Sequence, residues 1–374
     1  MKQFIALFFT LLLLSSCGNK KEGQTEVASE TYNVEFAKGF TIKKFDNYVQ
    51  VTVTDPWDST SMLRKYILVD KKAELPANLP QGILVRTPLE NVAVYSTIHC
   101  TVLNELDLLG IIKGVCEPEY VDIDYIQTGI KNGSIADLGL AGSPNIEKII
   151  MLDPEAIMAT PIEGQTYGSI EKTKIPIIET PDYMEATPLG RAEWVKFYSV
   201  FLGKEELADS LFKATVRNYD AVKSKIAGVK ERPTVFTDRK YGNVWYMPGG
   251  KSYMSNMFKD AGATYIWETD NDRTGSLPLP FETILDRAGD AQFWLIKYNQ
   301  PTQMTYNQLE EEFKPYSYFG AFKNRNIWGC NSGVVPYYED LPIHPDYILQ
   351  ELAYIFHPEL FTDYQPRYYR RLNE

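Results

Sequence analysis

The distribution of apolar residues divides the chain into a strand-rich N-terminal region and two later stretches that mix strands and helices. Within residues 31–88, apolar residues at Val49, Val51 and Val53 alternate with polar ones, as in a strand with one buried face. The Pro-rich segment "ELPANLPQG" interrupts the apolar runs that follow. We therefore predict a β-rich N-terminal extension over residues 31–88, built around a small β-hairpin.

Short apolar runs in residues 89–187 are typical of buried parallel strands. These runs are "NVAVYS", "IIKGVC", "EAIMATP" and "IPIIET". A helix over "HCTVLNELDLLG" is expected to end at Gly110, a residue type that suits a helix C-cap. A second helix, "SPNIEKIIML", is expected to begin with Ser143 as N-cap and Pro144 at its first position. The pattern predicts one α/β lobe.

The stretch over residues 231–374 repeats this order of elements. Its strands are "PTVFTD", "ATYIW" and "AQFWLIKY", and its helices are "MSNMFKDAG" and the Pro-led helix in "LPLPFETILDRAG". Each lobe thus has a Pro-led helix with an acidic residue in its first turn, Glu147 in one and Glu282 in the other. Aligning these two residues also aligns Ile149 with Ile284. We predict two similar α/β lobes with central sheets, the second ending in a C-terminal helix.

Residues 188–230 are predicted to connect the lobes. Apolar residues recur at helical spacing from Lys204 to Ala227. At 1.5 Å per residue, such a helix is about 36 Å long, enough to run from one lobe to the other. The predicted fold class is therefore α/β, with two lobes joined by a single long helix.

The N-terminus is typical of an exported protein. Residues 1–16 carry Lys2 ahead of an apolar stretch that is short for a membrane span, which indicates a signal peptide. The "LSSC" that follows resembles a bacterial lipobox, so Cys17 is expected to be lipidated; the alternative is an ordinary signal peptide with an incidental Cys. Residues 17–30 are polar and are predicted to form a flexible tether.

Charge and cysteine usage exclude several classes of protein. The formal net charge is −11, and no run of basic residues exceeds two, which argues against a nucleic-acid partner. After Cys17 only Cys100, Cys116 and Cys330 remain, with no CxxC, so we predict no metal site. Buried free thiols are the favoured interpretation. Export also allows a Cys100–Cys116 disulfide.

Catalytic motifs are missing from the sequence. "PGGKS" at residues 248–252 resembles the end of a phosphate loop, but Trp245 stands where the first Gly of that motif is required. GxSxG, HExxH and GxGxxG are absent. A secreted α/β hydrolase would need a nucleophile–base pair, and none is visible. We predict that the protein is not an enzyme.

Ligands of open α/β sheets bind beyond the carboxyl ends of the strands. The loops concerned are "STIHC", "EPEY", "DRKYGNVWYMPGGKSY" and "KYNQ". The candidate ligand-binding residues in these loops are Thr97, His99, Tyr120, Arg239, Tyr241, Trp245, Tyr246 and Tyr298. Their aromatic rings would stack on a large planar ligand, and the alternative is that each ring belongs to the core or the rim. Because the chain has only three His, a buried polar role is favoured for His99 over metal ligation.

The lipobox, "ENVAVYSTIHCTVLNELDLLGIIKGVC" and "ADLG…SPNIEKIIMLDPEAIMAT" resemble the ABC-importer binding proteins for ferric siderophores, haem and cobalamin, over roughly residues 65–360. The resemblance implies that a ligand lies between the lobes and that Glu147 and Glu282 dock onto Arg pockets of a membrane permease. The alternative for each Glu is a helix-dipole role alone, worth about 0.3–1 kcal/mol.

The same resemblance implies the remaining properties. The expected ligand is a metal chelate, an iron complex such as a siderophore or haem, with cobalamin as the alternative. The expected partners are an ABC permease with its ATPase, and no resident cofactor is implied. We expect a monomer, anchored by lipid in the cell envelope and facing the periplasm, on either the inner or the outer membrane. A sensor or surface receptor that does not transport is a further alternative.

Overall fold

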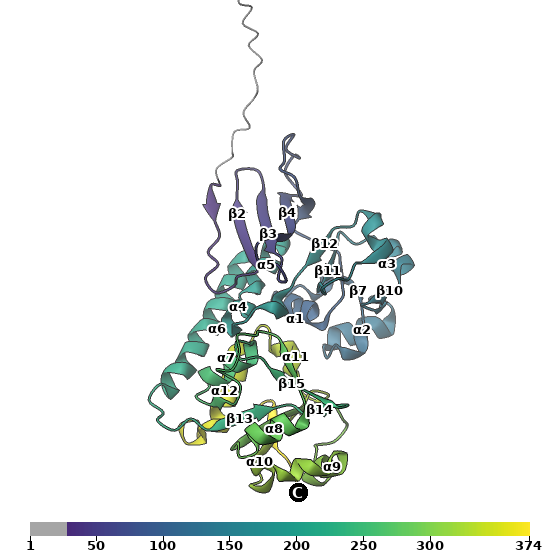
Figure 1. Ribbon diagram of the computed structural model, residues 1–374. Coiled ribbons are helices and arrows are strands. Elements are labelled where there is room, and N and C mark those ends of the chain that lie inside the picture. The colour runs from purple at the N-terminus through teal and green to yellow at the C-terminus, as the bar shows by residue number, and fades with distance from the viewer. Residues whose placement is uncertain (1–27) are drawn as a thin grey trace, which may run out of the picture.

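The computed structural model describes residues 28–374 and contains two α/β lobes, with a further β-sheet beside the N-terminal lobe (Figure 1). The predicted signal peptide, Cys17 and most of the predicted tether lie outside the described residues. Within residues 28–374, no helix is long and apolar enough to cross a membrane.

The N-terminal region forms a sheet of five strands, larger than the predicted hairpin. The strands are β1 (Glu30–Thr31), β2 (Phe40–Lys44), β3 (Val49–Thr54), β4 (Met62–Asp70) and β5 (Ile83–Thr87), in that spatial order. Neighbours are antiparallel except β4 and β5, which are parallel. The alternation seen in the sequence buries Val51 and Val53, as expected of a strand with one face against a core.

This sheet belongs to the hydrophobic core of the N-terminal lobe. Its buried residues pack against helix α5 (Trp194–Leu202), and the rings of Phe40 and Trp194 lie 4.8 Å apart between centroids. The Tyr66 hydroxyl donates to the carbonyl of Ile177, in the edge strand of the next sheet, at 3.0 Å. The extension is therefore an integral layer of the lobe.

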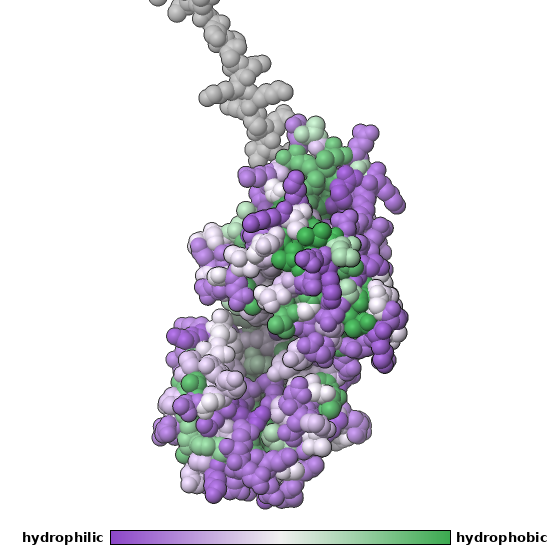
Figure 2. Space-filling view, turned by 90° about the vertical axis from the view of Figure 1, so that its right-hand side faces the viewer, coloured by the Kyte–Doolittle hydropathy of each residue, from purple (hydrophilic) through white to green (hydrophobic). Residues whose placement is uncertain are grey.

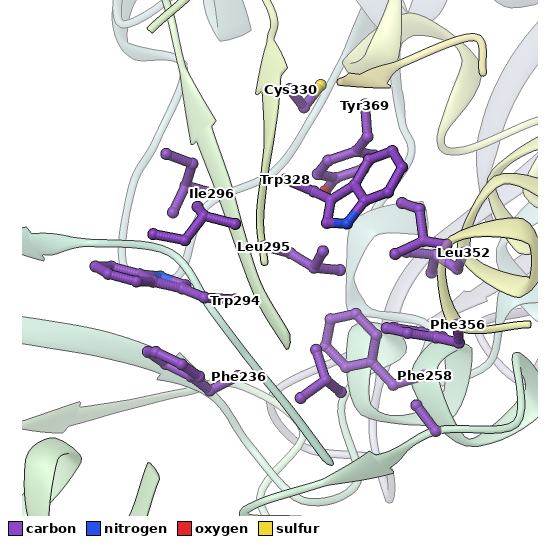
Figure 3. Close-up of a cluster of buried hydrophobic side chains, with 14 of the residues drawn as sticks. Phe236, Phe258, Trp294, Leu295, Ile296, Trp328, Cys330, Leu352, Phe356 and Tyr369 are labelled. Atoms are coloured by element: carbon purple, nitrogen blue, oxygen red, sulfur yellow. The ribbon is translucent and has the colours of Figure 1, made fainter. Parts of the chain in front are cut away.

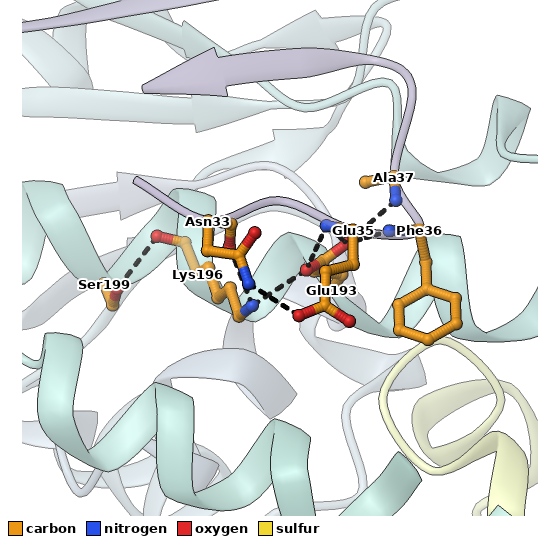
Figure 4. A network of polar contacts seen from close by, with 7 residues as sticks. All are labelled: Asn33, Glu35, Phe36, Ala37, Glu193, Lys196 and Ser199. Atoms are coloured by element: carbon orange, nitrogen blue, oxygen red, sulfur yellow. Dashed lines mark hydrogen bonds and ion pairs between the residues drawn. The ribbon is translucent and has the colours of Figure 1, made fainter. Parts of the chain in front are cut away.

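Two buried carboxylates, Glu193 and Glu185, hold the segment that enters this sheet, and Figure 4 shows the contacts of Glu193. The side chain of Glu193 accepts hydrogen bonds from the backbone N–H groups of Glu35, Phe36 and Ala37 at 2.7–3.1 Å, and from Lys196 Nζ at 2.8 Å. Glu185 accepts in the same way from the backbone N–H groups of residues 38 and 39 and from Trp194 Nε1. Every buried charge here therefore has a partner, as burial requires.

The N-terminal lobe contains a five-stranded parallel sheet of order β12-β11-β6-β7-β8. These strands are β6 (Val92–Val94), β7 (Ile112–Val115), β8 (Ala136–Asp137), β11 (Ala156–Ala159) and β12 (Ile177–Glu179). Its helices are α1 (Thr97–Glu105), α2 (Asp124–Asn132) and α3 (Ile146–Leu152), with a β9 (Gly139–Leu140) and β10 (Ser143–Pro144) pair before α3. The four apolar runs identified in the sequence are thus β6, β7, β11 and β12.

Two predicted helix ends are wrong. Helix α1 ends at Glu105, and Gly110 lies in a separate 3₁₀ turn at Leu109–Ile111. Helix α3 is capped by Asn145, whose side chain accepts from the Lys148 N–H at 3.0 Å, because Ser143 and Pro144 pair as strand β10 instead. Glu147 nevertheless lies in the first turn of the helix, as predicted.

Three helices connect the lobes: α4 (Pro188–Ala192), α5 and α6 (Glu205–Ile226). The 22 residues of α6 span about 33 Å at 1.5 Å per residue. Ala208 and Phe212 of its first half are buried in the core of the N-terminal lobe, whereas Tyr219, Val222 and Ile226 belong to the core of the C-terminal lobe. The predicted connecting helix is confirmed and is anchored in both cores.

The C-terminal lobe repeats the strand order of the first. Its sheet runs β16-β13-β18-β19-β20, parallel except for β20. The strands are β13 (Thr234–Thr237), β16 (Thr264–Tyr265), β18 (Phe293–Tyr298), β19 (Ile327–Asn331) and β20 (Tyr369–Arg371). The order β19-β18-β13-β16 matches β12-β11-β6-β7 in both chain sequence and position. The two lobes are therefore similar in topology, as predicted.

Helices and a small antiparallel sheet complete this lobe. The helices are α7 (Tyr253–Asp260), α8 (Phe281–Ala288), α9 (Tyr306–Glu312), α10 (Gly320–Lys323), α11 (Tyr337–Asp340) and α12 (Pro345–Phe356). The small sheet joins β14 (Lys240–Tyr241), β15 (Val244–Pro248) and β17 (Ser276–Leu279). An aromatic core fills the lobe (Figure 3), in which the rings of Phe236 and Trp294 stack at 5.0 Å between centroids.

Candidate functional site

The two lobes enclose a cleft at the carboxyl ends of their parallel strands. A cavity of about 850 Å³ lies there, lined by residues of both lobes, and the molecule is visibly hollowed between the lobes in Figure 2. We call this cavity the interlobe cleft. It is the position at which open α/β sheets bind ligands, and its volume suits a small molecule.

The N-terminal lobe contributes the loops that follow β6 and β7. Tyr95, Ser96 and Thr97 come directly after β6, and the Ser96 hydroxyl caps helix α1 by accepting from the Ile98 N–H. After β7, Glu117 adopts a left-handed backbone conformation with φ of 52°, which turns the chain into a short 3₁₀ helix at Pro118–Tyr120. The Tyr120 side chain is 61% exposed and lines the cleft.

The C-terminal lobe contributes the loops that follow β18 and β19. Asn299 follows β18 directly, and Ser332 and Gly333 follow β19. Tyr338 and Glu339 reach the cleft from α11, and the Tyr338 side chain is 48% exposed. Each wall of the cleft thus presents one tyrosine ring to solvent.

The charge of the cleft is negative. Its acidic lining residues are Glu117, Glu119, Asp122 and Glu339, and within residues 28–374 none of them forms an ion pair and no Lys, Arg or His lines the cavity. Burial raises the pKa of the Glu339 carboxyl, and the Asp340 and Asp122 carboxylates raise this pKa further. Since Asp122 stands on the opposite lobe, carboxylates of the two walls influence one another across the cleft.

A second cavity, which we call the N-lobe chamber, adjoins the cleft. It measures about 800 Å³ and shares Tyr95 and Ser96 with the cleft. Its apolar lining residues are Ile98, Ala141, Pro144, Ile146 and Ile162, with the rings of Tyr95, Tyr167 and Tyr183. Across the described part of the chain, no charged side chain lines this chamber. The Tyr95 side chain is 5% exposed, and its hydroxyl has no hydrogen-bond partner among the described residues.

The eight ligand-binding candidates from the sequence fall into three groups. Thr97 and Tyr120 line the interlobe cleft. His99, Trp245 and Tyr298 are buried in the core. Arg239, Tyr241 and Tyr246 lie elsewhere on the C-terminal lobe, outside the cleft lining.

Trp245 and Tyr298, both predicted to contact a ligand, are buried in the core, which was the alternative for such rings. Within β15, successive side chains point to opposite faces, so Trp245 enters the core while Tyr246 faces outward. The Trp245 side chain is 0% exposed, and its Nε1 donates to the carbonyl of Thr237 at 3.0 Å. The Tyr298 hydroxyl accepts from the Met304 N–H at 3.0 Å inside the lobe. Both side chains are part of the packed structure.

His99 has the buried polar role that the sequence favoured. Its Nε2 lies 2.9 Å from Thr180 Oγ1, and burial lowers the pKa of the imidazole to about 3, so the ring is neutral. Arg239 forms an ion pair with Glu312 and is therefore not free to meet an acidic ligand. Tyr241 and Tyr246 are 82% and 49% exposed but lie outside the cleft.

Neither a metal centre nor a disulfide is found in the described residues. No group of three or more His, Cys, Asp and Glu side chains converges within residues 28–374. Cys100, Cys116 and Cys330 are buried free thiols, so the alternative of a Cys100–Cys116 disulfide is wrong.

Several cleft residues escaped the sequence analysis. The loop after β19, which supplies Ser332, Gly333 and Tyr338, was missed because β19 itself was not identified. The run "NIWGC" was the available signal, since a short apolar run ahead of "NSG" fits a buried strand and its turn. Asn299 lies in the predicted loop "KYNQ", one residue beyond the predicted Tyr298.

Glu147 and Glu282 occupy equivalent places on the two lobes. Both side chains are exposed in the first turn of a helix, α3 or α8, and each helix precedes the matching strand, β11 or β18. Neither carboxylate forms an ion pair within the described chain. Beside Glu147, the apolar side chains of Ile150 and Met151 are 54% and 84% exposed.

The fold and the cleft define a two-lobed binding protein, and comparison with known proteins identifies the family. The family model described as "Periplasmic binding protein" matches residues 112–332, and the chain belongs to this family. An uncharacterized lipoprotein of Methanocaldococcus jannaschii is 27% identical over 366 residues, covering 91% of this chain and 85% of the relative.

Solved structures share the fold at low sequence identity. CeuE of Helicobacter pylori with Ni(II) bound is 15% identical with a TM-score of 0.58, covering 75% of this chain and 88% of that one. The periplasmic heme-binding protein HutB of Vibrio cholerae is 12% identical with a TM-score of 0.58, covering 72% of this chain and 99% of that one. The chain thus shares the fold of these solved binding proteins.

Proposed function

We propose that this protein is the lipid-anchored substrate-binding component of an ABC importer. It captures a metal chelate, an iron complex of the siderophore or haem type, in the interlobe cleft and delivers it to a membrane permease. The observation that carries the proposal is the cleft itself, a cavity of about 850 Å³ at the carboxyl edges of two topologically matched lobes. No chemistry on the ligand is involved, and the protein is not an enzyme.

The docking step rests on the two exposed glutamates. Glu147 and Glu282 place one unpaired carboxylate on each lobe, so two basic pockets on a permease would fix the orientation of the protein as well as its position. Ile150 and Met151 add an apolar rim beside Glu147. Neither glutamate lines the cleft, so docking and ligand capture use separate surfaces.

The names of similar proteins support a metal-chelate ligand and a lipid anchor. Among solved structures of the fold, one carries Ni(II), one belongs to an Fe3+-hydroxamate transport system and one binds heme, and two relatives in Methanocaldococcus jannaschii are lipoproteins. In this proposal the metal reaches the cleft inside its chelator. We place the lipid on Cys17 and the protein in the cell envelope, facing the periplasm.

A binding and uptake experiment tests this function. Full-length protein in lipid nanodiscs is titrated with ferric siderophores, haem and cobalamins, and uptake of the bound compound is compared in cells with and without the gene. Saturable binding of a ferric complex together with lost uptake in the deletion strain is expected. Tight binding of a cobalamin would favour the alternative ligand. Binding without any loss of uptake would favour a sensor or surface receptor over a transporter.

A further inference from the structure

The residues that line the two adjoining cavities indicate the charge and polarity of the ligand. This inference rests on the binding function proposed above. The interlobe cleft is acidic and has a tyrosine ring on each wall, whereas the N-lobe chamber is apolar. Both cavities are lined by Tyr95 and Ser96, so they adjoin at these two residues, and a ligand that reaches past them would occupy both. We propose that the ligand is an amphipathic molecule of net positive charge, with its cationic part in the interlobe cleft and an apolar arm in the N-lobe chamber.

The charge of the cleft carries the first half of this proposal. Four carboxylates, on Glu117, Glu119, Asp122 and Glu339, line the cavity without an ion pair anywhere in the part of the chain that the structure describes. The neighbouring cation Lys297 is already neutralised, because its Nζ lies 2.6 Å from Asp238 Oδ1. A cleft lined by one sign of charge concentrates ligands of the opposite sign and repels those of its own.

The aromatic rings of the cleft are a separate observation that favours a positively charged ligand. Tyr120 of the N-terminal lobe and Tyr338 of the C-terminal lobe are large, exposed rings on opposite walls of the cleft. The face of a tyrosine ring attracts a cation through its quadrupole, and pairs of such rings recognise organic ammonium groups. Rings and carboxylates on both walls therefore act together on a positively charged group.

The N-lobe chamber supports the second part of the proposal, the apolar arm of the ligand. It is lined mostly by aliphatic and aromatic side chains, and no charged group among residues 28–374 lines it. The polar part of its lining is uncharged and consists of Ser96, Ser143, Thr160, Gln165, Thr166 and Ser169. Transfer of an apolar arm from water to this surface would lower the free energy of the complex.

The binding of matched ferric complexes tests this proposal. Three ferric trihydroxamates with the same core carry a pendant ammonium group, an uncharged group or a pendant carboxylate, and each is made with and without an aryl arm. Affinity is measured by calorimetry on the full-length chain in uncharged nanodiscs, at low and high salt. We expect the ammonium complex to bind at least about tenfold more tightly than the carboxylate complex, with a preference that weakens in salt. Equal or tighter binding of the carboxylate complex would overturn the proposal.

Two pairs of variants assign the effect to the cavities. Glu119→Gln with Glu339→Gln should remove most of the preference for the ammonium complex, whereas the control with the same loss of charge, Glu310→Gln with Glu311→Gln on exposed α9, should retain it. Ala141→Trp should fill the chamber and abolish the affinity gained from the aryl arm, and Ala77→Trp on an exposed loop is its control. An aryl arm that contributes as much in Ala141→Trp as in the wild type would contradict the role of the chamber.

A metal-free aryl-alkyl ammonium compound separates this inference from the proposed function. If it binds through the cleft while no ferric complex binds, the cationic specificity stands and the metal-chelate function fails. If only the carboxylate-bearing ferric complex binds, the proposed function stands and this inference fails. If no member of the panel binds to folded protein, both are overturned.

Discussion

Glu193 links three backbone N–H groups to the ammonium group of Lys196 while its own side chain is 0% exposed. Replacing Glu193 with Ala would leave the three backbone donors without this acceptor and the buried Lys196 ammonium without its countercharge, with only the Asn33 carbonyl at 3.0 Å still accepting from it. Removing one partner of a buried charged pair costs about 3–5 kcal/mol. We expect Glu193→Ala to lower the free energy of unfolding by about this amount, measured by urea denaturation.

Exposed Glu310 supplies the control, since Glu310→Ala should change stability by less than about 0.5 kcal/mol. An equal effect of the two substitutions would show that the backbone donors near Glu35 find other acceptors. Because the sheet and the lobe share one core, we expect them to unfold in a single transition. A separate, earlier transition in Glu193→Ala would show that the N-terminal sheet is lost alone.

His344 provides a pH-dependent contact between the lobes. Its Nε2 lies 3.4 Å from Oε1 of Glu105 on α1. Burial lowers the pKa of His344, but the Glu105 carboxylate outweighs it, with Asp346 and Asp340 adding to the effect, so the pKa is raised above its ordinary value of 6.5. The contribution to stability is therefore complete below the unfolded-state pKa and is lost as the pH rises through the higher folded-state pKa.

We expect His344→Gln to destabilise the protein at acidic pH and to have a smaller effect at alkaline pH. The measurement is the difference in the free energy of unfolding between wild type and variant across this range. Glu105→Gln should remove the same pH dependence, which makes it the matched control for assignment. A difference that stays constant with pH would mean that the His344–Glu105 pair does not change its charge on unfolding.

At the scale of helices, the glutamate in the first turn of α3 and of α8 has two possible roles, interaction with the helix dipole or docking on a permease. If Glu147 and Glu282 act only on the helix dipoles, replacing both with Gln should cost at most about 1–2 kcal/mol of stability and leave uptake intact. If they dock on a permease, the double variant should bind ligand with unchanged affinity and lose transport, and double Lys replacement should be worse because it adds repulsion. Ligand affinity and uptake are measured on the same variants. Normal uptake by the double Lys variant would end the docking hypothesis.

Most strands could be predicted from the sequence because parallel strands covered on both faces are short continuous apolar runs. This rule found β6, β7, β11 and β12, and its failure at β19 left the loop after that strand unassigned. Helix ends were harder, since Ser143 and Asn145 are both suitable N-caps and the β9–β10 pairing decides between them.

The sequence predicted which loops form the candidate site better than it predicted which side chains face the cleft. The rule about carboxyl ends located the loops of Thr97, Tyr120 and Asn299. It did not decide which rings face the cleft, because strand alternation buries Trp245 in a core formed by distant segments. The Glu193 network was likewise invisible, since its partners are backbone N–H groups that have no signature in the sequence.

At the scale of the whole molecule, α6 limits how the lobes move. Phe212 fixes its first half in one core and Tyr219 fixes its second half in the other, so the lobes cannot separate without bending a packed helix. We expect small-angle scattering profiles with and without ligand to be nearly identical for the wild type. Lys213→Gly should cost up to about 1 kcal/mol and make the profile depend on ligand, because it weakens the exposed middle of the helix.

Lys213→Ala removes the same side chain and keeps helix propensity, so it should behave as the wild type does. A large change in the wild-type profile on ligand binding would show that closure takes place elsewhere than in α6, and the effect of Lys213→Gly would then be confined to stability.

The carboxylates of Glu193 and Glu185 also determine how the fold carries mechanical load from the proposed anchor at Cys17. A pull from the membrane would enter the fold at β1, which pairs with β2 over only two residues. We expect β1 to separate from β2 first, which would lengthen the segment between the membrane and the fold. The force would then act on Glu35–Gly39, whose backbone N–H groups are hydrogen-bonded to the carboxylates of Glu193 and Glu185. These hydrogen bonds come before the two α/β lobes along the chain, so they would bear the force before it could change the shape of the cleft.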